Sequence, residues 1–471
     1  MSRLVLGPFN RVEGDLEVTL ETENGRVESA KVNSPLYRGF EQILQGKDPM
    51  DALAIAPRIC GICSVSQSVA SSLALSDAMG LEVPENGRIA RNLVHACENL
   101  ADHITHFYLF FMPDFARDGY SQKSWHERIA KRFQAVKGEA AGDVLPARAA
   151  FLRLMGLLAG KWPHSLSIQP GGSLRAIDRA EKMRIHAHLR EFRRFLEDTL
   201  FGDSLESVAS LGSAGSLFQL KGGDFAAFLE ASKDLGLSRY GRATDSFMSY
   251  GNYPVGEGTL FPSGVWSGEL LPLEPGTILE DVSHSWMEGE TLHPSEGFTQ
   301  PMADKEGAYS WCKAPRLGGR VVETGALARQ VITGQPLVRE LVSVSGGNVE
   351  NRVIARLVET ARVAIEMEKW ALQLKPGEPF CSHGKMPQEA KGAGLVEAAR
   401  GSLGHWIEVR RGRIHNYQIV SPTTWNFSPR DEKGVPGALE QALVGAPVDG
   451  NCVMVQHIVR SFDPCMVCTV H

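Results

Sequence analysis

Two Cys-x-x-Cys pairs lie near opposite ends of a chain of 471 residues. Cys60 and Cys63 belong to the stretch RICGICS, and Cys465 and Cys468 belong to DPCMVCTVH, with which the sequence ends. Thiolates are soft donors, and four of them in two pairs favour a tetrahedral transition-metal site. The pairs are roughly 400 residues apart, whereas a zinc ribbon usually places its pairs within about 15–20 residues. A shared metal site is therefore the favoured interpretation.

Two alternatives remain open on spacing alone. A structural zinc ion joining the chain ends would use the same four cysteines but would require no particular residues around them. A thioredoxin-like redox pair needs only one of the two motifs and leaves the other unexplained. The remaining cysteines are scattered, and we expect each to be a small buried hydrophobic residue: Cys97, Cys312, Cys381 and Cys452.

The composition is that of a globular protein with a sizeable core. Hydrophobic residues make up 43% of the sequence, and the formal net charge is −6, so no basic surface for nucleic acid is expected. No apolar run approaches the length of about 18 residues that would indicate a membrane span. The start, MSRLVLGPFNRVEGD, lacks the features of a signal peptide, and the few cysteines do not form a disulfide framework. We therefore expect a cytoplasmic protein, with export left open if a partner subunit carries the signal.

Alternating apolar and polar residues predict β-structure near both ends of the chain. Residues 15–32, DLEVTLETENGRVESAKV, are expected to form a hairpin that turns at Asn24-Gly25, preceded by a short strand at residues 3–7. Residues 405–421, HWIEVRRGRIHNYQIVS, are expected to form a second hairpin that turns at Arg411-Gly412.

Apolar residues at helical spacing predict three long helices, over residues 86–112, 175–201 and 348–374. The section from about 203 to 345 is rich in Gly, Ser and Pro and is expected to consist of short strands and loops. No repeat or clear linker divides the chain. We therefore expect residues 1–471 to form a single compact domain of the α+β class, predominantly helical, with small antiparallel sheets near both termini.

Five further motifs occur in order along the chain: NRVEGDLEV, YRGFEQIL, DHITHFY, EAARGSLGHW and VSPTTWNFSPRD. Together with the residues around the two cysteine pairs, they resemble the large subunit of nickel–iron hydrogenases. The resemblance covers most of the chain and implies the hydrogenase large-subunit fold and the heterolytic cleavage of H2. A homologous subunit of respiratory complex I has lost the cysteines, whereas all four are present here.

The resemblance implies that the paired cysteines hold a nickel–iron centre, Ni-Fe(CN)2(CO). Cys60 and Cys465 match the residues that bind nickel alone, and Cys63 and Cys468 match those that bridge nickel to iron. Thiolates suit this centre because they tolerate several oxidation states of nickel.

Further residues match those that surround the iron ligands in this family. Arg400 and Thr423 match the residues that hydrogen-bond the two cyanides, and Asp102 and Asp463 match acidic residues that orient the arginine. A permanently charged guanidinium with diverging donors suits a buried anionic ligand.

Proton transfer and a second metal are also implied by the resemblance. Glu13 matches the proton-transfer glutamate beside the last bridging cysteine, and a raised pKa is expected for a carboxyl near thiolates in a closed site. Glu41 and His471 match ligands of a magnesium ion, and the backbone carbonyl of Ile419 completes the protein set.

Oxidation of H2 releases two electrons, and the chain has no further cysteine cluster suited to iron–sulfur ligation. The resemblance implies a partner that receives them, a small hydrogenase subunit carrying iron–sulfur clusters. H2 is then the substrate of the large subunit.

Several residues depart from the usual motifs of the family and help to distinguish a sensory hydrogenase from a metabolic one. Gln67 stands where many energy-conserving members have His, at a position expected to influence hydrogen bonding to a cysteine sulfur, and Ala399 stands where proline is usual. Ile62 and Phe110 resemble the H2-sensing, regulatory hydrogenases, which report to a histidine kinase. The favoured expectation is a sensor, and the alternative is a metabolic uptake hydrogenase feeding a respiratory acceptor. Core packing alone also accounts for Ile62 and Phe110.

Overall fold

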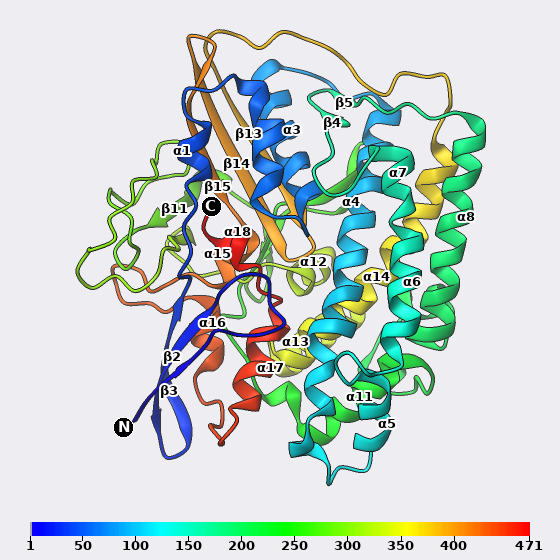
Figure 1. Ribbon diagram of the computed structural model, residues 1–471, viewed down its shortest axis with the longest axis vertical. Coiled ribbons are helices and arrows are strands. Elements are labelled where there is room, and N and C mark those ends of the chain that lie inside the picture. The colour runs from blue at the N-terminus through cyan, green and yellow to red at the C-terminus, as the bar shows by residue number, and fades with distance from the viewer. Residues whose placement is uncertain (1) are drawn as a thin grey trace.

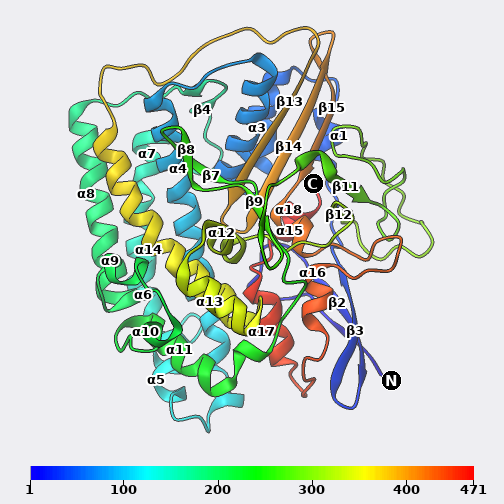
Figure 2. The ribbon, with the colours of Figure 1, turned by 180° about the vertical axis from the view of Figure 1, so that it is seen from behind.

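A layer of long helices lies beside a set of small antiparallel sheets in the computed structural model, which describes residues 2–471 (Figure 1). The layer contains α4 (Glu85–Thr105), α6 (Ala140–Phe151), α8 (Arg179–Phe195) and α14 (Val349–Gln373). α14 packs against both α4 and α8, as the view from behind shows (Figure 2). The predominantly helical α+β fold predicted from the sequence is confirmed.

The three predicted long helices are present, with ends that local capping explains. α4 continues beyond Thr105 as a π-helical turn, His106–Phe111. α8 begins at Arg179 because Asp178 caps it. The Asp178 carboxylate accepts a hydrogen bond from the Glu181 N–H at 2.7 Å, and the Glu181 carboxylate accepts one from the Asp178 N–H at 3.0 Å.

Antiparallel sheets lie near both ends of the chain, as predicted. The first contains β1 (Ser2–Leu6), β2 (Glu17–Glu23) and β3 (Arg26–Asn33), and the other contains β13 (Ala390–Ala398), β14 (Gly401–Arg410) and β15 (Arg413–Val420). The two hairpins β2–β3 and β14–β15 were expected from the sequence. β13 was not predicted, because its first half, AKGAG, lacks the large apolar residues that mark a strand.

Helix α3 (Ser64–Met79) lies directly against β13 and β14. Glycine makes this close approach feasible, since a Cβ atom added at Gly394 would lie 1.9 Å from the carbonyl oxygen of Ala70. The helix that follows Cys63 is thereby fixed to the hairpin whose turn contains Arg400.

The prediction of short strands and loops for residues 203–345 was wrong for part of that section. It contains the helices α11 (Gly223–Leu235), α12 (Ala326–Thr333) and α13 (Pro336–Ser345), besides the shorter α9 (Leu205–Ala209) and α10 (Ala214–Leu217). The glycines taken as loop markers end helices instead: Gly236 and Gly334 adopt left-handed conformations, with φ of 63° and 80°, after α11 and α12. Short strands, β6 to β12, and two short 3-10 helices, Leu237–Arg239 and Pro275–Thr277, make up the rest of the regular structure there.

The largest hydrophobic cluster draws its members from Leu16 to Cys468 and includes the four paired cysteines, and three smaller clusters are separate from it. Of the scattered cysteines, Cys97, Cys312 and Cys452 are buried as expected, but Cys381 is only half-buried. Cys381 lies in the irregular segment between α14 and β13, where its thiol contacts backbone carbonyls rather than the core.

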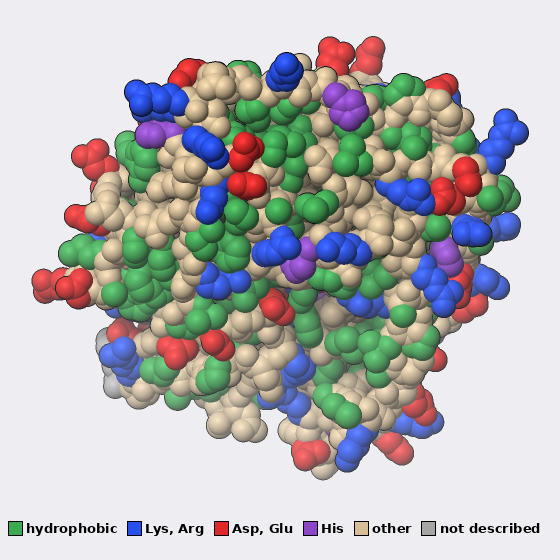
Figure 3. Space-filling view, turned by 45° about the horizontal axis from the view of Figure 1, so that its top comes forward, with side chains coloured by type: hydrophobic (Ala, Val, Ile, Leu, Met, Phe, Trp, Pro, Cys, Tyr) green, Lys and Arg blue, Asp and Glu red, His purple; other side chains and the backbone are tan. Residues whose placement is uncertain are grey.

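The surface carries charges of both signs. Figure 3 shows acidic and basic side chains interspersed over one face, in keeping with the small net charge of −6. Among residues 2–471, no helix combines the length and apolar character needed to cross a membrane.

The contact between α3 and β13 generates a stability prediction. Gly394→Ala should lower the melting temperature, because the added methyl group collides with the Ala70 carbonyl and overpacking costs about 1–3 kcal/mol. Gly142→Ala, at an exposed position in α6 with no atom near the new methyl group, is the matched control and should leave the melting temperature unchanged or raise it. Equal effects of the two substitutions in thermal unfolding would contradict this account of the helix–sheet contact.

Candidate metal centre

Four cysteine sulfurs meet in one buried cluster. The Sγ atoms of Cys63 and Cys468 are 3.0 Å apart, and those of Cys465 and Cys468 are 3.2 Å apart. The Sγ atoms of Cys60 and Cys465 are separated by 3.5 Å. Because all four sulfurs lie within 4.8 Å of one another, the donor set fits a thiophilic metal, although the two pairs come from opposite ends of the chain.

Backbone contacts hold the second pair in place. The Met466 N–H donates to the carbonyl of Glu13 at 2.7 Å, and Glu13 forms a β-bridge with Cys465. The hydroxyl oxygen of Thr423 accepts a hydrogen bond from the Cys465 N–H at 3.2 Å. The hydroxyl hydrogen of Thr423 remains available for another acceptor.

One guanidinium nitrogen of Arg38 joins the two cysteine segments. Its Nη2 donates to the carbonyl of Ile59 at 2.6 Å and to the carbonyl of Val467 at 2.5 Å. Ile59 precedes Cys60 and Val467 precedes Cys468, so Arg38 links a residue beside one ligand of each pair. Sequence reasoning missed this role, because nothing in YRGFEQIL indicates which carbonyls the arginine meets.

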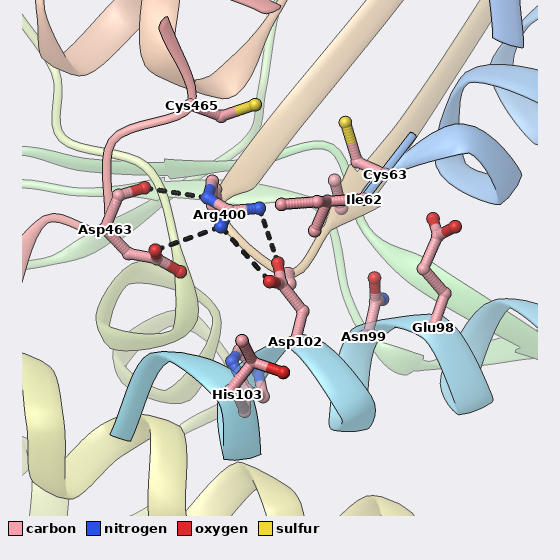
Figure 4. Close-up of polar contacts among 12 residues, drawn as sticks. Ile62, Cys63, Glu98, Asn99, Asp102, His103, Arg400, Asp463 and Cys465 are labelled. Atoms are coloured by element: carbon pink, nitrogen blue, oxygen red, sulfur yellow. Dashed lines mark hydrogen bonds and ion pairs between the residues drawn. The ribbon is translucent and has the colours of Figure 1, made fainter. Parts of the chain in front are cut away.

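Arg400 lies beside the cysteine cluster between two carboxylates (Figure 4). Its Nη1 and Nη2 donate to the carboxylate of Asp102 at 2.5 and 3.1 Å, and its Nη2 donates to Asp463 Oδ1 at 3.0 Å. Its Nε donates to the backbone carbonyl of Asp463 at 2.8 Å. Burial lowers the pKa of Arg400, but Asp102 and Asp463 outweigh burial and raise it well above its ordinary value. The guanidinium is therefore charged.

A second buried arginine fixes the turn that contains Arg400. Arg329 donates to the carbonyls of Ala398 and Ala399 at 2.9 and 3.0 Å. Its charge is balanced by Glu359 and Glu397, at 2.7 and 2.8 Å. Sequence reasoning missed Arg329, because its partners come from distant segments of the chain.

Glu13 presents a half-buried carboxyl beside the thiols. Burial raises the pKa of Glu13, and the neighbouring Cys60 raises it further, against the positive charges of Arg400 and Arg38. The net direction is upward, as expected from the sequence. A carboxyl with a raised pKa accepts a proton more readily than an ordinary carboxyl does, which suits it to proton transfer.

Glu41, Ile419 and His471 meet around a small cavity. The Nε2 atom of His471 lies 2.7 Å from the Ile419 carbonyl oxygen and 3.5 Å from Glu41 Oε1. The cavity measures about 20 Å³, and Glu280 and Lys313 also line it. This space is sufficient for one water-sized occupant.

Gln67 lies on α3, and its side chain points to β14. Its Oε1 accepts a hydrogen bond from His405 Nε2 at 2.8 Å, and the hydroxyl of Tyr417 donates to His405 Nδ1 at 2.8 Å. Burial lowers the pKa of His405 to about 3, so the ring is neutral and this direction of hydrogen bonding is consistent. Ile62 and Phe110 are both partly buried, and the Ile62 N–H donates to Cys60 Sγ at 3.3 Å.

The bridging role of Arg38 generates a second prediction. Arg38→Ala should loosen the C-terminal segment, because the carbonyls of Ile59 and Val467 lose their shared donor, at a cost of about 1 kcal/mol for a partly exposed charged hydrogen bond. Limited proteolysis should cleave residues 463–471 faster than in the unaltered protein. Arg58→Ala, which removes a neighbouring arginine bonded only to the local carbonyl of Ala54, is the control. Unchanged cleavage of the Arg38 variant would refute the linking role.

Comparisons with known proteins agree with this site. A family profile described as "Nickel-dependent hydrogenase" matches residues 38–121 and 143–471. The periplasmic [NiFeSe] hydrogenase large subunit of Desulfomicrobium baculatum is 32% identical over 100% of this chain and 95% of its own length. The uptake hydrogenase large subunit of Bradyrhizobium diazoefficiens is 28% identical over 100% of this chain and 95% of its own.

A solved structure also shows similarity to a hydrogenase. The Ni-Fe-Se hydrogenase from D. vulgaris Hildenborough in the reduced state superposes with a TM-score of 0.86 at 33% identity, covering 100% of both chains. The four clustered positions of the present chain all carry cysteine. The chain belongs to the family of nickel-dependent hydrogenase large subunits and is an oxidoreductase that acts on H2.

Proposed function

We propose that Cys60, Cys63, Cys465 and Cys468 hold a nickel–iron centre at which H2 is cleaved heterolytically. The observation that carries the proposal is the meeting of the four sulfurs within 4.8 Å in a buried site. When bound, such a centre supplies an open coordination position for H2 and accepts its electrons. Cys60 and Cys465 would bind nickel alone, and Cys63 and Cys468 would bridge nickel to iron.

Arg400 and Thr423 would bind the cyanide ligands of the iron. A guanidinium has five N–H donors, and the contacts with Asp102 and Asp463 occupy four of them, which leaves one on Nη1. The free hydroxyl hydrogen of Thr423 offers a second donor. Asp102 and Asp463 would therefore orient Arg400 and still leave one of its N–H groups to donate to a cyanide.

Glu13 would accept the proton released from H2 and pass it outward. Its backbone lies alongside Cys465, and its carboxyl is half-buried and close enough to Cys60 for the thiol to raise its pKa. Glu41, His471 and the carbonyl of Ile419 would hold a magnesium ion in the cavity of about 20 Å³, since carboxylate and carbonyl oxygens are the donors that magnesium prefers.

Electrons would leave through a small subunit that carries iron–sulfur clusters. Among residues 2–471, the four paired cysteines form the one cluster of three or more His, Cys, Asp and Glu side chains arranged to hold a metal ion, so the iron–sulfur clusters would come from another chain.

A regulatory, H2-sensing role is proposed on the resemblance of Ile62, Gln67 and Phe110, and a histidine kinase would then be the partner. A metabolic uptake role is the second candidate, favoured by the similarity to an uptake hydrogenase large subunit. Turnover with an artificial acceptor dye and co-purification distinguish them. Slow turnover with a bound kinase supports the sensor, whereas fast turnover with a bound cytochrome supports the uptake enzyme. The cytoplasmic location stays a prediction.

Cys468→Ser tests the proposed ligand set. A hydroxyl is a hard and poor substitute for a bridging thiolate, so nickel and iron should fall to a small fraction of the content of the unaltered protein, with loss of activity. Cys97→Ser, at a buried cysteine outside the cluster, should retain both metals. Normal nickel, iron and activity in the Cys468 variant would refute the assignment.

Glu13→Gln tests the proton path. The amide keeps the shape of the side chain but cannot carry the proton, so H2/D2 exchange and dye reduction should both fall by about two orders of magnitude or more while the metal content stays intact. Glu17→Gln, on neighbouring β2, is the matched control. Near-normal exchange in the Glu13 variant would require the protons to leave by another route.

A further inference from the structure

Glu98 is a buried carboxylate surrounded by hydrogen-bond donors near the first cysteine pair. Its oxygens accept from the backbone N–H groups of Val65 and Ser66, each at 2.8 Å, and from the indole N–H of Trp162 at 2.9 Å. The hydroxyls of Ser66 and Ser64 donate at 3.0 and 3.4 Å. The residue is 2% exposed.

These contacts replace the cap that α3 lacks. α3 begins at Ser64, so Val65 and Ser66 are its second and third residues, whose N–H groups an N-terminal capping side chain normally satisfies. Cys63 holds the capping position but makes no side-chain cap, because its sulfur lies in the thiol cluster, 3.0 Å from Cys468. Glu98 therefore supplies from α4 the acceptor that a metal-binding cysteine cannot provide.

The position of Glu98 on α4 connects the cap to the rest of the site. Asp102 follows Glu98 by one turn and holds Arg400, and Figure 4 shows both carboxylates projecting from the same side of the helix. One rigid helix thus anchors the segment of Cys63 through Glu98 and the guanidinium of Arg400 through Asp102.

We propose that Glu98 is a positioning residue for the metal centre. As a cap supplied by α4, it holds the N-terminus of α3 in place and thereby keeps the Cys63 sulfur at the correct distance from the other three sulfurs. The inference rests on the proposed function of the cysteines. When Glu98 is deprotonated, its negative charge is also attracted to the partial positive charge at the N-terminus of α3, which adds to the hydrogen bonds.

The donors around Glu98 explain why glutamate is required rather than an amide. Val65, Ser66 and Trp162 present N–H groups that can only donate, so the carboxylate must accept on both oxygens. Glutamine in its place would turn an N–H of its amide toward one of these donors and leave at least one buried N–H unsatisfied.

Glu440 offers a matched control elsewhere in the fold. It is also buried, and its carboxylate accepts from the Val32 N–H at 3.0 Å, the Tyr309 hydroxyl at 2.8 Å and the Gly437 N–H at 3.3 Å. Burial raises the pKa of both Glu98 and Glu440 to about 7, so the two carboxyls are matched in environment. Glu440 has no hydrogen bond to a cysteine segment.

The experiment compares Glu98→Gln with Glu440→Gln in the large subunit co-produced with its small subunit. The measurements are the melting temperature, the nickel retained during dialysis against a chelator, and the infrared bands of the metal-bound diatomic ligands. Both variants should lose thermal stability, but only Glu98→Gln should shift the infrared bands and weaken nickel retention by about tenfold or more. Identical bands and retention in the two variants would overturn the inference.

A milder variant covers the case in which Glu98→Gln does not fold. Trp162→Phe removes one of the donors to Glu98 and leaves the carboxylate and the cysteines intact. It should shift the infrared bands in the folded enzyme by a smaller amount, and unchanged bands would count against the positioning role. Absence of nickel in the unaltered protein would instead refute the proposed function, so the two failures are distinguishable.

Discussion

Four sulfur atoms within 4.8 Å of one another in a buried site cannot all be ionised unless a cation lies between them. Neighbouring thiols and burial raise the pKa of Cys63 well above its ordinary value, and burial does the same for Cys468. Only a bound metal ion therefore makes it favourable for all four cysteines to be thiolates in this arrangement. Because the two cysteine pairs are far apart in the sequence, much of the surrounding structure serves to bring these sulfurs together and to keep them there.

Three arginines and one helix perform that task at different points. Arg38 joins carbonyls next to both cysteine pairs, and Arg329 fixes the turn that contains Arg400. Helix α4 carries Glu98 and Asp102 one turn apart. Glu98 accepts hydrogen bonds from the start of α3, and Asp102 accepts hydrogen bonds from Arg400. A buried ion pair is costly unless its geometry is complete, and each of these charged groups is matched by several partners. The site is therefore held by many hydrogen bonds and ion pairs rather than by any single strong contact.

The sequence allowed the helices and the ligands to be predicted, but not the contacts that hold them. α4, α8 and α14 were foreseen because their apolar residues recur with helical spacing over many turns. β13 and α11 to α13 were missed because glycines in or beside them were interpreted as signs of loops. In the structure these glycines allow close packing or end helices. The cysteine pairs were visible as motifs, and the family resemblance singled out Arg400, Asp102 and Asp463. Glu98 and Arg329 carry no local signal, since their function depends on partners such as Val65 and Ala398 that only the folded chain brings near.

The most direct test of the account is metal analysis combined with infrared spectroscopy of the purified large and small subunits together. The account predicts nickel and iron in equal amounts at the large subunit, with sharp bands from one bound CO and two cyanides. Zinc as the metal of the four cysteines, or nickel without those bands, would contradict the proposal that the cluster of Cys60, Cys63, Cys465 and Cys468 holds a nickel–iron centre.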